Sequence, residues 1–126
     1  MRNAICLTLL LFSAISCQSQ VANQLSAEAF KAQIENEENS FKVLDLRTDE
    51  EVATGMVPGA EQLDFLSDDF DSKLRALNKE NTYYIYCKSG GRSGKTLNQM
   101  TELGFKKVYE LEGGMNAWKA SGLTTE

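Results

Sequence analysis

The stretch Tyr83-Tyr-Ile-Tyr-Cys87-Lys-Ser-Gly-Gly-Arg92-Ser93 decides the fold of this 126-residue chain. Its first four residues favour a buried β-strand, because aromatic and β-branched side chains pack well in a sheet. The small residues after Cys87 predict a turn, and the spacing of Leu97, Met100 and Leu103 predicts that a helix follows. A strand, a short turn and a helix in succession are typical of α/β proteins.

The same alternation continues on both sides of this stretch. Strands are predicted over 41–46 and 108–111, with a short one around 62–65 after the turn at Pro58-Gly59. Helices are predicted over 26–34, with Ser26 as N-cap, over 68–77 and from 113 onward, and 48–54 has room for one helical turn. We therefore expect a mostly parallel central sheet with helices on both faces and functional residues at the carboxyl ends of its strands.

The composition excludes several classes of function. The chain has 13 basic and 18 acidic residues, a net charge of -5 and 9% aromatic residues, so nucleic acid is not an expected partner. It contains no histidine, which rules out Ser-His-Asp triads, Cys-His dyads and metal sites that need histidine. We expect one domain without a metal ion or a bound cofactor.

The N-terminus has the pattern of a secretory signal. Residues 1–16 hold one early positive charge, an apolar run over 4–12 and then small residues. Cys17 follows directly, as in a bacterial lipobox, and residues 17–24 form an uncharged tether before a domain over 25–126. We expect a lipidated Cys17 that holds the domain at a bacterial cell envelope, facing the periplasm; the alternative is that Cys17 merely lies near an ordinary cleavage site.

The remaining cysteine is the candidate nucleophile. Cys6 would leave with the signal and Cys17 would be modified, so Cys87 would be the only free thiol and no internal disulfide could form. Backbone N–H groups of the turn and the dipole of the following helix would stabilise its thiolate. Between 81 and 101 the chain has three cations, Lys88, Arg92 and Lys95, and no acids. The alternative is that Cys87 is a small packing residue at the end of a strand.

Two other motifs share these residues and can be tested by counting. Protein tyrosine phosphatases and related arsenate reductases have five residues between cysteine and arginine, whereas four separate Cys87 from Arg92. The segment Ser89-Gly-Gly-Arg-Ser-Gly-Lys-Thr96 matches a Walker A motif except at its first glycine, where Ser89 stands. Nucleotide binding is therefore not expected.

The segment Cys87-Lys-Ser-Gly-Gly-Arg92-Ser93 resembles the active-site loop of single-domain rhodanese-like sulfurtransferases. The stretches Asp45-Leu-Arg47-Thr-Asp-Glu-Glu51 and Gly55-Met-Val-Pro-Gly-Ala60 resemble the first signature of that family, and 103–118 resembles its final one. Together they cover roughly residues 25–122 in the family's order. Met56 is a departure, because family members commonly carry histidine there.

This resemblance implies a rhodanese-like fold and a sulfurtransferase. The Cys87 thiolate would attack the outer sulfur of thiosulfate or a similar small anionic donor, release sulfite and carry the sulfur as a covalent persulfide. A thiol or cyanide would then accept it. The backbone amides of 89–93 would bind the donor, and Lys88 and Arg92 would attract it. Asp45 and Arg47 would support the loop as an ion pair. The expected substrate-binding residues are Lys88, Ser89, Gly90, Gly91, Arg92 and Ser93.

Two alternatives remain open at this point. The domain could be a persulfide carrier or thiol-sensing module, docked to a membrane partner and with little steady-state turnover. A phosphatase or arsenate reductase is the weaker alternative, because the loop between Cys87 and Arg92 is one residue too short. Turnover with a small donor and acceptor separates the first alternative from an enzyme, and turnover of a phosphate ester would favour the second.

Overall fold

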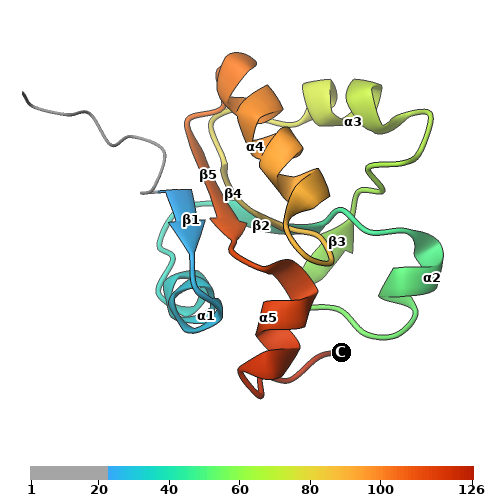
Figure 1. The fold of residues 1–126 in the computed structure, drawn as a ribbon. Coiled ribbons are helices and arrows are strands. Elements are labelled where there is room, and N and C mark those ends of the chain that lie inside the picture. Colours follow the sequence, from blue (N-terminus) through green and yellow to red (C-terminus); the bar gives the residue numbers. More distant parts are fainter. Residues whose placement is uncertain (1–22) are drawn as a thin grey trace, which may run out of the picture.

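A five-stranded parallel sheet forms the centre of the protein (Figure 1). The computed structural model describes residues 23–126; the predicted signal, Cys17 and most of the tether lie outside them. The strand order is β1-β5-β4-β2-β3, and every neighbouring pair is parallel. The strands are β1 (Gln24–Leu25), β2 (Phe41–Asp45), β3 (Ala60–Gln62), β4 (Thr82–Tyr86) and β5 (Lys107–Leu111).

Helices cover both faces of this sheet, which confirms the predicted fold class (Figure 1). They are α1 (Ala27–Glu35), α2 (Asp49–Val52), α3 (Phe70–Ala76), α4 (Gly91–Glu102) and α5 (Gly114–Ala120). Helices α1 and α5 pack on one face, and α3 and α4 pack on the other. Ser26 caps α1 as predicted, because its hydroxyl accepts the N–H of Ala29.

Strand β4 lies between β5 and β2 and is buried along its whole length. Because side chains alternate across a strand, Tyr83 and Ile85 enter the core beneath α3 and α4, whereas Tyr84 and Tyr86 enter the core beneath α1 and α5. A strand buried on both faces explains why the sequence has a continuous apolar and aromatic run here. Its carboxyl end places Cys87 near the middle of the sheet edge.

Two short strands differ from the sequence prediction. Strand β1 was not predicted, because two residues are too few to show a periodic pattern; its Gln24 pairs with Glu110 of β5. Strand β3 begins two residues earlier than the predicted 62–65, directly after the Pro58-Gly59 turn, and is held by pairing with β2. No helix between residues 23 and 126 is both long and apolar enough to cross a membrane.

Candidate active site

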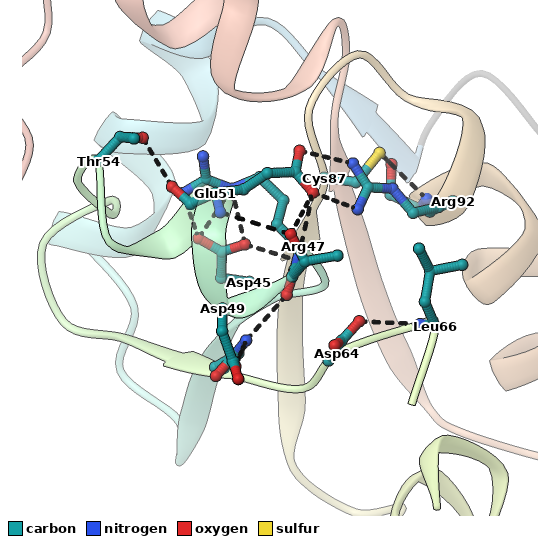
Figure 2. Close-up of polar contacts among 12 residues, drawn as sticks. Asp45, Arg47, Asp49, Glu51, Thr54, Asp64, Leu66, Cys87 and Arg92 are labelled. Atoms are coloured by element: carbon teal, nitrogen blue, oxygen red, sulfur yellow. Dashed lines mark hydrogen bonds and ion pairs between the residues drawn. The ribbon is translucent and has the colours of Figure 1, made fainter. Parts of the chain in front are cut away.

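Cys87 directly follows strand β4 and is only 1% exposed. The chain then turns through residues 88–90 and enters α4 at Gly91. Gly90 has a φ of 112°, a backbone conformation that favours glycine, so this residue type is required for the turn. The turn and the first turn of α4 both contact the sulfur, through the backbone N–H groups of Gly90 and Ser93. Figure 2 shows Cys87 and Arg92 at this end of the sheet.

The sulfur of Cys87 is surrounded by hydrogen-bond donors. The backbone N–H of Gly90 lies 3.2 Å from Sγ, and the backbone N–H and the hydroxyl of Ser93 each lie 3.4 Å from it. Burial by itself raises the pKa of the Cys87 thiol, but the hydrogen bonds from Ser93, Gly90 and Ser89 outweigh burial and leave the pKa below its ordinary value. The site therefore favours a thiolate without a histidine.

Helix α5 fixes the loop from its other side. The N–H groups of Met115 and Asn116, in its first turn, donate to the carbonyl groups of Cys87 and Lys88 at 2.9 and 3.0 Å. This approach requires glycine at 114, because a Cβ atom there would lie 2.4 Å from the Cys87 carbonyl oxygen. Gly114, the first residue of α5, thus has a structural role in the site.

Asp45 and Arg47 form a buried ion pair at the end of β2 (Figure 2). The Arg47 guanidinium lies 2.7 Å from Asp45 Oδ2 and also donates to the carbonyl of Gly55 at 2.7 Å. The hydroxyl of Tyr86 donates to the same carboxylate at 2.5 Å and accepts the N–H of Val57 at 3.0 Å. The pair thus connects the segment 55–57 to the residue that precedes Cys87.

Arg92 does not stand free beside the sulfur. Its guanidinium forms a bidentate ion pair with Glu51 of α2, at 2.7 and 2.9 Å (Figure 2). Glu51 also completes a capping box with Thr48. The hydrogen bonds from Arg92, with those from Thr48, overcome burial and lower the pKa of Glu51 to about 2. The count of charges over 81–101 missed Glu51, because this residue lies 41 positions from Arg92 in the sequence.

A depression of about 270 Å³ lies next to the loop. Lys88 lines it from the loop and Lys119 lines it from α5, opposite the acidic residues Glu50 and Glu51 of α2. Sequence reasoning missed Lys119, because only the packing of α5 brings it to this edge. Of the other predicted binding residues, Ser89 and Gly91 are exposed in the loop. Within residues 23–126, no group of three His, Cys, Asp or Glu side chains could hold a metal ion.

A family model for the rhodanese-like domain matches residues 26–121. The chain belongs to the rhodanese-like domain family. The match spans all five helices and the strands β2 to β5, and it includes the loop around Cys87.

Individual relatives agree with this assignment. The Bacillus subtilis protein named "Putative sulfurtransferase YtwF" is 40% identical over 96 residues, which are 76% of this chain and 89% of that protein. A protein of Allochromatium vinosum named "Sulfurtransferase" is 31% identical over 103 residues, covering 82% of this chain and 94% of its own length. The crystal structure of a rhodanese-like domain protein from Staphylococcus aureus superposes with a TM-score of 0.67 at 32% identity, over 82% of this chain and 98% of that one.

Proposed function

We propose that this protein is a sulfurtransferase that carries sulfur as a persulfide on Cys87. The observation that carries the proposal is the set of donors around Sγ, because Gly90 and Ser93 stabilise negative charge on the sulfur in a buried site. The names of the relatives support the same class of reaction.

The proposed reaction has two steps. The Cys87 thiolate attacks the outer sulfur of thiosulfate, the sulfur–sulfur bond of the donor breaks, and its electron pair leaves with sulfite. Cyanide or a thiol then attacks the terminal sulfur of the persulfide, and Cys87 leaves as thiolate. When cyanide is the acceptor, neither step needs a general base, because the attacking groups are anions and the leaving groups are stabilised. No cofactor enters this scheme.

The cations next to the loop would select an anionic donor. Lys88 and Lys119 line the depression from two elements, so a dianion such as thiosulfate would meet positive charge close to the loop. In this proposal Arg92 acts mainly by shaping the loop, because Glu51 already occupies its guanidinium. The backbone N–H groups of the loop would hold the persulfide.

The test is steady-state formation of thiocyanate from thiosulfate and cyanide. We expect sustained turnover by the purified protein and none by a Cys87→Ser variant, which keeps the size of the side chain but lacks the nucleophile. Residual turnover by that variant would contradict the mechanism. One equivalent of transferred sulfur followed by no further turnover would instead favour a persulfide carrier.

We further propose that the protein acts at a bacterial cell envelope, anchored through a lipid on Cys17. The apolar run, the small residues and the cysteine that follows support this location. Membrane association in a bacterial host should be lost in a Cys17→Ser variant, while the parent chain should sediment with membranes. Equal distribution of the two proteins would contradict lipid anchoring.

A further inference from the structure

A groove separate from the depression beside Lys88 follows helix α4. Its volume is about 670 Å³, and no residue lines both hollows. The helix contributes positions three or four residues apart, which lie on one face. The rest of the lining comes from β5, from β1 and from Asn23, which directly precedes β1. The lining includes Gln24, Gly91, Gly94, Lys95, Asn98 and Glu110.

A buried carboxyl group faces this groove from strand β5. Glu110 is 2% exposed, and its Oε1 accepts a hydrogen bond from the side-chain amide of Gln24 at 3.4 Å. Its Oε2 has no hydrogen-bond partner within residues 23–126. Helix α4 passes this oxygen at Gly94, where an added Cβ atom would lie 3.8 Å from Oε2. Buried polar atoms are usually paired, so this oxygen is a candidate acceptor for a donor from outside residues 23–126.

A basic residue also lines the groove. Lys95 is exposed, lines the same groove, and forms no ion pair with any residue in 23–126. The groove is thus lined by an acid and a base that form no ion pair with each other. The amides of Gln24 and Asn98 lie among the lining residues and supply further donors and acceptors.

We propose that this groove binds a small zwitterion of the α-amino acid type. Its ammonium group would donate to Oε2 of Glu110, and its carboxylate would face Lys95. An ammonium group suits Glu110 because it offers three N–H donors and balances a buried negative charge. A multivalent metal ion suits it less, because no cluster of three ligating side chains exists in residues 23–126. Gly91 belongs to both the groove and the catalytic loop, so the ligand would lie against the loop's outer side.

The test is a titration of the full-length, ¹⁵N-labelled protein with L-alanine, followed by amide chemical shifts. We expect saturable shifts at Gly94, Lys95 and Glu110. Ethylamine and propionate each carry only one of the two charges, and each should bind at least tenfold more weakly. Glu110→Gln keeps the shape of the side chain but not its charge, and Lys95→Ala removes the basic side chain; each should raise the Kd for alanine at least tenfold.

The controls separate this site from the rest of the molecule. Glu112→Gln removes a neighbouring acid that does not line the groove, and Cys87→Ser removes the proposed nucleophile; both should leave the Kd for alanine unchanged. Absence of saturable shifts, ethylamine binding as tightly as alanine, or an unchanged Kd in Lys95→Ala would each overturn the proposal. If Glu110→Gln fails to fold, the exposed Lys95→Ala variant decides. None of these outcomes depends on sulfur transfer.

Discussion

At the scale of single residues, the reactivity of Cys87 depends on a balance between burial and hydrogen bonding. Burial opposes the charged thiolate, and the donors of Ser93, Gly90 and Ser89 favour it. Hydrogen bonds to charged groups contribute about 1.5 to 3 kcal/mol each, so the loss of one donor should be measurable. Hydrogen-bond donors fixed in the loop thus favour the thiolate, a role that a histidine base has in a Cys-His pair.

The hydroxyl of Ser93 provides the first prediction. In Ser93→Ala the side-chain donor is lost and burial remains, so the pKa of Cys87 should rise and alkylation by iodoacetamide at neutral pH should slow several-fold. The pH profile of alkylation measures this change. Ser89→Ala is the matched control, because Ser89 acts through its backbone N–H and should keep the parent rate. Equal rates for the parent and Ser93→Ala would contradict this account of the thiolate.

The ion pair between Glu51 and Arg92 provides the second prediction. Glu51→Gln removes the negative charge and weakens the capping box, which should lower the free energy of unfolding by about 1 to 2 kcal/mol at pH 6. Urea unfolding measures this change in the free energy of unfolding. Glu50→Gln, at an exposed neighbouring position, should change little.

The pH dependence of this difference follows from the pKa of Glu51. The pKa of Glu51 in the folded protein, about 2, lies below the ordinary value of 4.5, so the carboxylate stabilises the fold fully above pH 4.5 and the contribution is lost as pH falls toward 2. The gap between parent and Glu51→Gln should therefore shrink between pH 5 and pH 3. A constant gap over this range would contradict the ion pair as its cause.

The sequence predicted some of these residues and not others, for a physical reason. Cys87 and the donors of its loop are neighbours in the chain, so local turn chemistry indicated their arrangement. Glu51 and Lys119 reach the site from other elements, and only tertiary packing brings them there. The Asp45–Arg47 ion pair was within reach of sequence reasoning, because the two residues are separated by one position at a strand end.

At the scale of elements, the contact between α5 and the loop positions the site. The N–H groups in the first turn of α5 have no partner within the helix. Two of them donate to the carbonyl groups of Cys87 and Lys88. Those hydrogen bonds hold the backbone of the loop while its own N–H groups face the sulfur. The position of α5 is thus coupled to the geometry around Cys87.

Gly114→Ala tests this coupling. Its added Cβ would approach the Cys87 carbonyl oxygen to 2.4 Å at a φ of 59°, so the backbone must shift. We expect a loss of about 2 to 4 kcal/mol in unfolding free energy and slower alkylation of Cys87. Gly122→Ala also has a positive φ, 72°, but no atom within 4 Å, and should cost only about 1 kcal/mol with normal alkylation. Equal effects of the two variants would contradict a specific contact.

Sequence periodicity predicted the long elements well and the short ones poorly. Strand β4 and helix α4 carry five and twelve residues, enough for a clear pattern. Strand β1 has two residues and β3 has three, and both are defined by pairing with a neighbour rather than by their own residues. Such pairing is a property of the assembled sheet.

At the scale of the whole molecule, the last residues of the sequence pack against a segment far away in the chain. Met56 and Glu126 exchange two backbone hydrogen bonds of 2.8 Å, and Trp118 donates to the carbonyl of Thr124 at 2.9 Å. The neighbouring Gly55 and Val57 belong to the network of Arg47 and Tyr86. The C-terminal residues 124–126 are therefore connected, through the segment 55–57, to Tyr86, the residue before Cys87.

Deletion of residues 123–126 should destabilise the protein. Two backbone hydrogen bonds and the partner of a buried tryptophan are lost, so we expect a decrease of about 2 to 3 kcal/mol in unfolding free energy and a lower Tm. Glu126→Ala keeps the backbone bonds and should leave Tm close to that of the parent. A deletion variant with the parent Tm would show that the tail does not stabilise the domain.

The most direct test of the central claim is the intact mass of the protein after incubation with thiosulfate. The account predicts a gain of one sulfur atom, located on Cys87 by peptide mapping, absent from Cys87→Ser and removed by cyanide. No gain of mass in a folded protein whose Cys87 still reacts with iodoacetamide would contradict sulfur transfer through Cys87.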